Sequence, residues 1–308
     1  MTVATTPILV GMGLCYSVSC QSVSCVSCCS SDDEGVRKVA LKLPHGSKGV
    51  TWVQNKFQPV DINKWLEQIY KKWKPTGWLC YNDDLPEGTH TTRGHCKGIL
   101  TWNDTRIGWL IHSVPRFPQT FDGSALSPIG QAELIYGQSF LYVEQSRIHL
   151  SLEDVLRQIE WMKPNFFHKH NMPPVIPYNS TPLEIKILRW SPTIIHLAKS
   201  PDHATDFIGV ELQKGNDVEW FEESWKRGSE YAKHQGLTSI ETLTIDGTTF
   251  NSSQDHSKWA VTQDHVWIGD LNHMKSQEKR GGGGMVITDD DLASAFLSFL
   301  ASLGFKKS

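Results

Sequence analysis

Two stretches of sequence, one in each half of the chain, share a pattern that predicts how the chain folds. The first is GHCKGILTWNDTRIGWLIH at residues 94–112, and the second is DHSKWAVTQDHVWIGDLN at residues 255–272. Each contains a His-x-Lys motif, followed by an apolar run, a polar turn, a second apolar run and a polar residue. Short apolar runs on either side of a polar turn are typical of a β-hairpin. The repetition predicts one such hairpin per half, with His112 and Asn272 at matching places.

The histidine and the lysine of each motif are separated by a single residue. Because side chains alternate between the two faces of a strand, His95 and Lys97 are expected on the same face. The same reasoning applies to His256 and Lys258. If the two halves pack about a pseudo-two-fold axis, these faces converge on one site with two imidazoles and two ammonium groups. A third His-x-Lys, which begins at His273, has no hairpin after it and is interpreted as background.

A site of this composition can cleave a phosphodiester. One neutral imidazole attacks phosphorus and forms a phosphohistidine, while the other imidazole, protonated, donates to the leaving oxygen. The roles then reverse, with water as the incoming group. The lysines hold the non-bridging oxygens and offset the charge of the transition state, so this chemistry needs no metal ion and no other cofactor. Because an unperturbed histidine titrates at about pH 6.5, such a site favours mildly acidic conditions.

The alternative interpretation is that each histidine is an ordinary strand residue whose neighbouring lysine extends into solvent. For one isolated pair this alternative is stronger, because a chain with 13 histidines contains about one His-x-Lys by chance. The duplication of the pair, the hairpin and the terminal polar residue favours the catalytic interpretation.

The composition limits the classes of function. The chain has 308 residues, with 30 Lys and Arg against 33 Asp and Glu, a formal charge of −3 and a mean hydropathy of −0.34. This balance excludes a strongly basic, histone-like nucleic-acid binder and an acidic disordered chain. No apolar run is long enough to span a bilayer. Local positive charge can still hold a DNA backbone, and the candidates near the two hairpins are Arg93, Arg116, Lys279 and Arg280.

Elsewhere the chain mixes helical and strand patterns, which predicts an α/β or mixed α+β fold. Apolar spacing and capping residues predict helices over residues 62–73, 152–162, 219–234 and 289–303. β-rich runs predict strands over residues 98–102, 108–114, 138–144, 194–198, 207–212, 259–262 and 266–271. The four consecutive glycines at 281–284 are interpreted as a mobile or turn-forming loop.

Prolines concentrated between residues 173 and 182 mark the joint between two halves. The predicted division is a leader at 1–34, an N-terminal half at 35–172 with the first motif, and a C-terminal half at 173–308 with the second.

The leader contains five of the seven cysteines and an apolar centre, but no positively charged start. It is either a secretory signal or a cysteine-rich tail. Only Cys80 and Cys96 lie beyond it, which leaves room for one disulfide. Three Asn-x-Ser/Thr sequons weakly favour a secreted glycoprotein, and they begin at Asn103, Asn179 and Asn251.

At the two His-x-Lys hairpins and several other segments, the chain resembles the deoxyribonuclease II family, whose members are acid endonucleases of the phospholipase-D-like superfamily. The similar segments follow in order along nearly the whole chain after the leader. They are LCYNDD at 79–84, RGHCKG at 93–98, WLIHSVPRFP at 109–118, YGQSFL at 136–141, DHSKWAV at 255–261, and IGDLN at 268–272 leading to KRGGG at 279–283.

The resemblance implies a pseudo-dimer of two similar halves, each a β-sheet flanked by helices, with one active site between them. It also implies metal-independent hydrolysis of double-stranded DNA to 3′-phosphate ends, in a lysosomal or secreted setting. The catalytic motifs of the family carry over to His95, Lys97, His256 and Lys258, and its supporting positions to His112, Asp270 and Asn272. We favour His95 as the nucleophile and His256 as the general acid.

Two other functions stay open. The chain can be another phosphodiesterase of the superfamily, acting on phospholipid or RNA, or an inactive homologue that binds DNA or another anionic polymer. The presence of histidine and lysine in both hairpins argues against loss of activity. The sequence does not distinguish a monomer from a homodimer.

Overall fold

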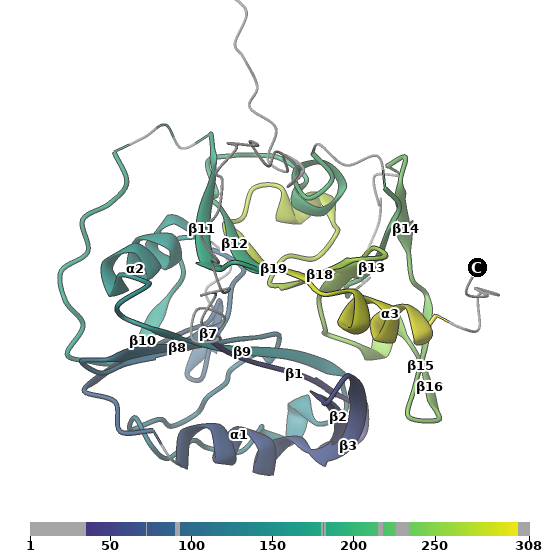
Figure 1. Cartoon of the computed structure of the whole chain (residues 1–308), viewed down its shortest axis with the longest axis horizontal. Coiled ribbons are helices and arrows are strands. Elements are labelled where there is room, and N and C mark those ends of the chain that lie inside the picture. The colour runs from purple at the N-terminus through teal and green to yellow at the C-terminus, as the bar shows by residue number, and fades with distance from the viewer. Residues whose placement is uncertain are drawn as a thin grey trace, which may run out of the picture.

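The computed structural model describes residues 35–71, 73–89, 93–179, 181, 183–214, 218–225 and 234–300. The predicted leader at 1–34, with its five cysteines, lies outside the described residues. Two large β-sheets and three α-helices form the framework of the described chain (Figure 1). The mixed α and β fold that the sequence predicts is confirmed.

The first sheet contains eight strands, all from residues 36–170, and each strand runs antiparallel to its neighbours. Its spatial order is β10-β4-β7-β8-β9-β1-β2-β3. Strands β7 and β8 are the first predicted hairpin, in which Gly98 pairs with Ile111. The strands are β1 Val36–Lys42, β2 Lys48–Val53, β3 Lys56–Asp61, β4 Gly77–Tyr81, β7 Gly98–Trp102, β8 Arg106–His112, β9 Gln138–Ser146 and β10 Phe166–His170.

The second sheet contains seven strands from residues 185–288, in the order β11-β12-β19-β18-β17-β13-β14. Only β13 and β14 are parallel neighbours. Strands β17 and β18 are the second predicted hairpin, in which Trp259 pairs with Ile268. The strands are β11 Ile185–Ser191, β12 Ile194–Lys199, β13 Trp220–Glu223, β14 Leu237–Ser239, β17 Trp259–Val261, β18 His265–Gly269 and β19 Gly282–Thr288. Two small hairpins pair β5 Asp84–Leu85 with β6 Gly88–Thr89, and β15 Thr242–Ile245 with β16 Thr248–Asn251.

The three α-helices are those predicted near 62–73, 152–162 and 289–303. They are α1 Ile62–Lys71, α2 Leu152–Trp161 and α3 Asp290–Ser298. Ser151 Oγ accepts a hydrogen bond from the Glu153 amide at the start of α2, and the Asp289 carboxylate accepts one from the Leu292 amide at the start of α3. These caps satisfy amides that have no partner inside the helix. In the described part of the chain, no helix has the length and apolarity needed to cross a membrane.

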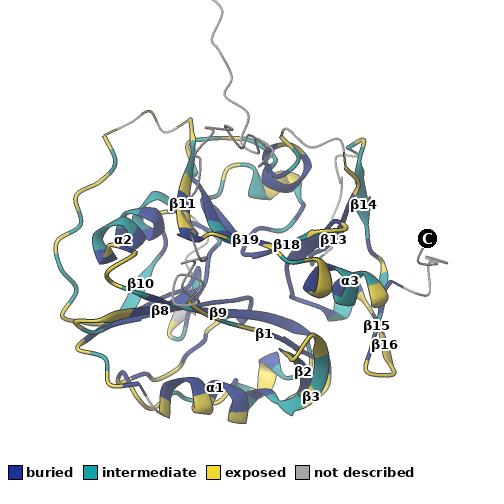
Figure 2. Cartoon of the chain, viewed as in Figure 1, coloured by how far each residue is buried: buried dark blue, intermediate teal, exposed yellow. Residues whose placement is uncertain are grey.

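The sheets and helices are stacked in layers (Figure 1). Helix α1 covers one face of the first sheet, with Leu66 and Tyr70 in their shared core. Helices α2 and α3 lie between the two sheets, and the largest core combines their apolar side chains with residues of both sheets. A π-helical turn, Phe207–Glu211, covers the far face of the second sheet. Both sheets are therefore largely buried, whereas exposed residues gather on α1 and in the loops (Figure 2).

The two sheets repeat one five-stranded unit. In each unit, the strand that comes first in the sequence lies at one edge, beside the strand that comes last. The spatial order is β4-β7-β8-β9-β1 in the first sheet and β13-β17-β18-β19-β12 in the second. A helix follows the last strand of each unit, α2 after β9 and α3 after β19. The chain passes between the sheets over residues 171–184, which include the predicted joint. The domain limits at 35–172 and 173–308 stay predictions.

Two sequence predictions of secondary structure are wrong. The predicted helix at 219–234 begins instead with strand β13, whose four residues are all buried, and 226–233 lie outside the described residues. A short apolar run fits either structure, and pairing with β17 and β14 selects the strand. The predicted strand at 207–212 is the π-helical turn, because the Asp206 carboxylate accepts the Gly209 amide and caps that turn.

The glycines at 281–284 do not form the expected loop. Gly282 to Gly284 begin β19, a buried strand paired with β12 on one side and β18 on the other. Glycine favours a loop because its backbone is flexible, but hydrogen bonding along both edges fixes this segment.

Cys80 and Cys96 are both buried and free. Cys80 belongs to the core on the α1 side of the first sheet, whereas Cys96 belongs to the core between the sheets. The disulfide that the sequence allowed is therefore absent from the described chain.

Candidate active site

Each motif histidine is held by a glycine from the opposite half. The His95 amide donates to the Gly281 carbonyl at 2.7 Å, and the His256 amide donates to the Gly137 carbonyl at 2.9 Å. Gly137 immediately precedes β9, and Gly281 immediately precedes β19, so the two contacts are equivalent. A Cβ atom on Gly137 would lie 2.4 Å from Asp255 Oδ1, and one on Gly281 would lie 2.0 Å from the Met162 carbonyl. Both positions therefore require glycine.

The first motif is surrounded by charged side chains. The Lys97 ammonium forms a buried ion pair with Asp83, whose other oxygen lies 3.1 Å from Arg280 Nη2 and 3.7 Å from His95 Nε2. Burial alone would raise the pKa of Asp83, but the three positive neighbours outweigh it and hold that pKa well below its usual range. Asp83 is therefore ionised and anchors the Lys97 side chain.

A main-chain contact fixes the orientation of the His95 ring. Its Nδ1 lies 2.7 Å from the Asp270 carbonyl oxygen, which can only accept, so Nδ1 carries the proton. In the neutral ring Nε2 then keeps its lone pair. Burial is the main reason that the pKa of His95 lies well below its usual value, and the Lys258 ammonium contributes although Asp83 opposes it. Burial therefore favours the neutral imidazole, and the Asp270 carbonyl fixes its proton on Nδ1.

The second motif is surrounded by aromatic rings. The His256 ring is stacked between Tyr136 and Trp225, with ring centroids 4.0 Å and 3.4 Å away. Its Nδ1 lies 3.8 Å from Glu133 Oε2. The Lys258 ammonium donates to the His256 carbonyl at 2.6 Å, and burial, with Lys97 as a secondary cause, lowers the pKa of Lys258 to about 7.

Lys97 and Lys258 link the two motifs. Each acts electrostatically on His112 and Asp270, and Lys97 also acts on Glu133, the neighbour of His256. The two His-x-Lys pairs therefore belong to one buried cluster that crosses from one half to the other.

His112 and Asp270 both belong to this cluster. His112 Nδ1 accepts the Val114 amide at 3.2 Å, and burial holds the pKa of His112 well below its usual value. Its remaining proton is therefore on Nε2, which donates to no described residue. The Asp270 Oδ1 atom accepts the Lys97 amide at 3.2 Å, while Oδ2 has no hydrogen-bond partner among the described residues. Burial raises the pKa of Asp270 to about 8.

Asn272 does not occupy the place that matches His112. Gly98 lies three residues after His95 and pairs with Ile111 in the first hairpin. Trp259 lies three residues after His256 and pairs with Ile268 in the second hairpin. The residue equivalent to His112 is therefore Gly269. Counting residues along the sequence placed the match at Asn272 because it could not reveal the register between the strands.

Similarity to known proteins identifies the family of this chain. Residues 51–304 match the family described as Deoxyribonuclease II. This is more than half of the chain. The chain belongs to the deoxyribonuclease II family. It is 30% identical over 271 residues to cell-death-related nuclease 7 of Caenorhabditis elegans, covering 78% of this chain and 72% of that protein.

Mammalian members of the deoxyribonuclease II family are similar over comparable lengths. Deoxyribonuclease-2-beta of Mus musculus is 29% identical over 80% of this chain and 77% of its own length. Deoxyribonuclease-2-alpha of Rattus norvegicus is 27% identical, over 82% of this chain and 79% of its own length. The family is one of hydrolases that act on DNA, so the chain is assigned to an enzyme class and not only to a fold.

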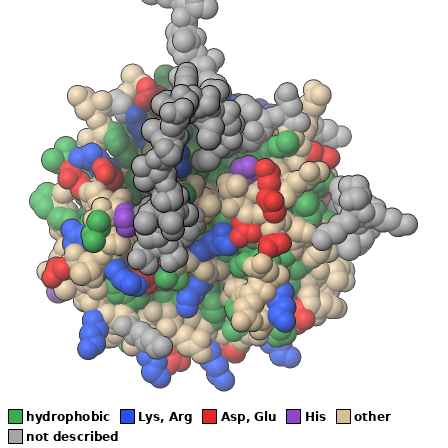
Figure 3. All heavy atoms as spheres, in the orientation of Figure 1, with side chains coloured by type: hydrophobic (Ala, Val, Ile, Leu, Met, Phe, Trp, Pro, Cys, Tyr) green, Lys and Arg blue, Asp and Glu red, His purple; other side chains and the backbone are tan. Residues whose placement is uncertain are grey.

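The basic residues predicted to hold DNA differ in their surroundings. Arg280 donates to the Arg93 carbonyl at 2.8 and 2.9 Å besides contacting Asp83, so its guanidinium is held within the protein. Arg116 is half-exposed and lies 3.3 Å from Glu133. The Arg93 and Lys279 side chains are exposed. On the face shown in Figure 3, positive side chains are scattered among negative ones, and DNA binding by these four residues stays a prediction.

Sequence reasoning missed four residues of this buried cluster: Asp83, Glu133, Tyr136 and Trp225. Asp83 and Tyr136 lie in segments that carry the family resemblance, and this was the available signal. Glu133 and Trp225 had none, because only the fold brings them to His256.

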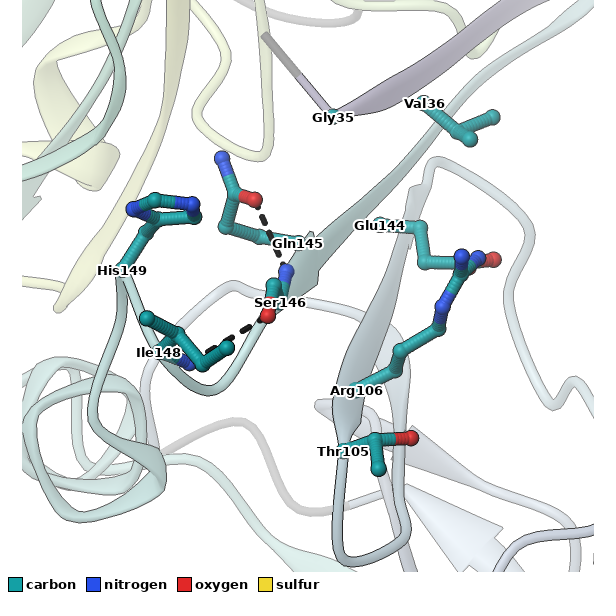
Figure 4. Close-up of a pocket in the computed structure, with 9 residues that line it drawn as sticks. All are labelled: Gly35, Val36, Thr105, Arg106, Glu144, Gln145, Ser146, Ile148 and His149. Carbon is teal, nitrogen blue, oxygen red and sulfur yellow. Dashed lines mark hydrogen bonds and ion pairs between the residues drawn. The ribbon is translucent and has the colours of Figure 1, made fainter. Parts of the chain in front are cut away.

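A surface pocket of about 530 Å³ lies elsewhere, at the edge formed by β1, β8 and β9 (Figure 4). Arg106 and Glu144 form one wall, and His149 lies on the other side. None of the predicted site residues lines it. Its lining lacks the paired histidines and lysines, so we assign the chemistry to the buried cluster.

Proposed function

We propose that the chain is an acid endonuclease that hydrolyses double-stranded DNA without a metal ion and leaves 3′-phosphate ends. The observation that carries this proposal is the reciprocal contact between halves, in which each motif histidine donates its amide to the glycine that precedes a strand of the other half. With the electrostatic effect of both lysines on His112 and Asp270, this contact supports one shared site for two histidines and two lysines from separate hairpins. The family membership supports the same reaction class.

In the first step, the lone pair of His95 Nε2 attacks phosphorus. The bond from phosphorus to the 5′ oxygen breaks, and that oxygen takes a proton from His256. The 3′ side of the DNA is then held as a phosphohistidine on His95. Burial favours the neutral form of His95, and the Asp270 carbonyl fixes its proton on Nδ1, which leaves the Nε2 lone pair free to attack; this favours the assignment over the reverse one.

In the second step, His256 removes a proton from water, which attacks phosphorus and breaks the bond to His95 Nε2. The product keeps its phosphate on the 3′ side, and both histidines return to their starting states. Lys97, Lys258 and the Nε2–H of His112 supply positive charge and donors to the non-bridging oxygens.

The acid preference follows from two buried groups. Lys258, with a pKa of about 7, carries its charge below that pH and loses it as the pH rises through 7. Asp270, with a pKa of about 8, is neutral in acid and does not repel phosphate. Both groups therefore favour binding of a phosphodiester at acidic pH. We extend the proposal to an acidic, lysosome-like or secreted location, which microscopy of the tagged full chain against an acid-organelle marker tests.

The test is cleavage of supercoiled plasmid at about pH 5 with EDTA present, since the lysines replace the metal as the source of charge. We expect nicked and linear DNA whose ends block primer extension until a phosphatase removes the 3′-phosphate. Cleavage only after Mg²⁺ is added, or ends that extend without phosphatase, would overturn the mechanism. Cleavage of RNA or phospholipid in place of DNA would overturn the substrate assignment.

A further inference from the structure

A second cluster of titratable side chains lies in the C-terminal half, outside the proposed catalytic cluster. One oxygen of Asp206, Oδ2, lies 2.9 Å from His234 Nε2 and 3.0 Å from His273 Nε2. Three ligand atoms, one from each residue, all lie within 4.8 Å of one another. His273 belongs to the third His-x-Lys, the one that the hairpin pattern left without a role.

The three residues come from separate segments of the fold. Asp206 precedes the π-helical turn, His234 precedes β14, and His273 follows β18. His273 is buried, whereas Asp206 and His234 are partly exposed, so the cluster opens toward solvent on one side. An ion from solvent can therefore reach it.

The surroundings orient these side chains toward a common point. The Asp206 Oδ1 atom accepts the Gly209 amide at 2.9 Å, which directs Oδ2 to the two rings. His273 Nδ1 lies 3.5 Å from Glu222 Oε1, and the His273 amide donates to Ser224 Oγ at 3.1 Å. A carboxylate behind the far nitrogen of a histidine is the usual outer partner of a metal-bound imidazole.

We propose that Asp206, His234 and His273 bind one Zn²⁺ ion, with a fourth position open to water. Two imidazoles and one carboxylate are a donor set that zinc accepts. Bonds of about 2.0–2.1 Å in a tetrahedral site separate the ligand atoms by about 3.4 Å. The two distances from Asp206 Oδ2 to the histidine nitrogens, 2.9 and 3.0 Å, would therefore lengthen on binding, and the rings would adjust within the 4.8 Å limit that holds for all three ligand atoms.

The role of this ion is structural. It ties the segment after β18, which also carries Asp270, to the π-helical turn and to the residues before β14. Hydrolysis by the proposed mechanism takes no step through it. Removal of zinc is therefore expected to lower the melting temperature while DNA cleavage at low temperature persists.

The competing arrangement is a proton in place of the ion. Burial lowers the pKa of His273, but hydrogen bonds with Asp206 and Glu222 outweigh it and raise that pKa to about 9. A protonated His273 bridging two carboxylates explains the contacts without a metal, and only a binding measurement separates the two arrangements.

The experiment is titration of the chelator-treated full chain with Zn²⁺ at about pH 7.5, where zinc competes with the proton better than in acid. Exposed thiols are first alkylated, because the leader cysteines can also bind zinc. Co²⁺ in place of Zn²⁺ reports a tetrahedral site by its visible absorption. We expect one equivalent bound at micromolar Kd and a rise in melting temperature.

The variants are His234→Gln and Asp206→Asn, with His203→Gln as the matched control. His203 pairs with Glu211 at 3.0 Å in the same half but is not part of the cluster. His234 is partly exposed, so its replacement is expected to leave the fold intact. We expect at least tenfold weaker binding in both cluster variants and unchanged binding in the control. No binding at micromolar zinc, or equal binding in His234→Gln and the parent, would overturn the proposal.

Discussion

The two halves of the molecule use the same backbone contacts but surround their histidines with different side chains. Asp83 and Trp225 occupy equivalent positions, each two residues after the strand that pairs with the hairpin. The Asp83 carboxylate lies beside the His95 ring, whereas the Trp225 ring stacks on the His256 ring. One half thus supplies charge at the place where the other supplies an aromatic ring.

The residues that cross from the opposite half differ in the same way. Arg280 and Tyr136 each precede one of the two glycines that hold the motif histidines. Arg280 contacts Asp83, and Tyr136 stacks on His256. The proposed reaction requires one histidine as nucleophile and one as acid. A repeated scaffold with different neighbours meets this requirement, because the backbone fixes position and the side chains fix protonation.

The largest expected effect separates the two histidines. His95→Ala is expected to lower kcat by at least about 10⁴-fold on every substrate, because the nucleophile is lost. His256→Ala is expected to cost about 10²–10⁴-fold on DNA but little in the first-turnover release of nitrophenolate from thymidine 3′-(4-nitrophenyl phosphate), whose leaving group needs no acid. Steady-state rates on DNA and the pre-steady-state burst of nitrophenolate measure this, because the second step still requires His256 as the base. His265→Ala, on the same hairpin as His256, is the control, and a reversed pattern would exchange the two roles.

Asp83→Asn is expected to cost more stability than Trp225→Phe at the equivalent position. The buried Lys97 and Arg280 charges lose their partner, and such a loss costs about 3–5 kcal/mol. Urea unfolding of parent and variant measures the difference. A loss below that of Trp225→Phe would mean that Asp83 does not anchor the charged side of the site.

Lys42 and Lys199 are expected to have similar effects because they are equivalent in the two units. Each ammonium donates to three main-chain carbonyls, among them Leu134 before β9 and Arg280 before β19. Replacement by Met leaves buried carbonyls without donors, at a cost of roughly 1–3 kcal/mol each.

Urea unfolding of Lys42→Met and Lys199→Met, with the exposed Lys48→Met as control, tests this equivalence. If one variant loses several kcal/mol of unfolding free energy and the other loses none, the two lysines are not equivalent in their contribution to stability.

A smaller effect concerns pH. Lys258 loses its charge near pH 7, so the alkaline side of the activity profile is expected to fall through that value. Lys258→Arg keeps a charge to higher pH and is expected to move this fall upward by about one unit or more, with a lower maximum rate. A pH series of plasmid cleavage measures the shift. If the alkaline fall in activity stays at the same pH in Lys258→Arg, a group other than Lys258 causes it.

The smallest expected effect is at the aromatic stack. Trp225→Leu removes one ring from His256 and is expected to lower kcat two- to tenfold, since an aromatic pair contributes about 0.5–1.5 kcal/mol. Trp225→Phe keeps a ring and is expected to restore most of the rate. Equal rates in Leu and Phe variants would show that stacking does not position His256.

The sequence alone determined the local structures whose pattern is complete within a few residues. Both hairpins, the cap of α2 at Ser151 and the start of α3 at Asp289 follow from alternation, spacing and capping chemistry. The folded chain was needed to show that Trp220–Glu223 form a strand, that Gly282 begins one, and that Gly269 matches His112. These outcomes depend on edges and partners supplied by distant residues. A local pattern does not specify which residues the tertiary fold brings together. The contacts of Asp83 with His95 and of Trp225 with His256 therefore became visible only in the folded chain.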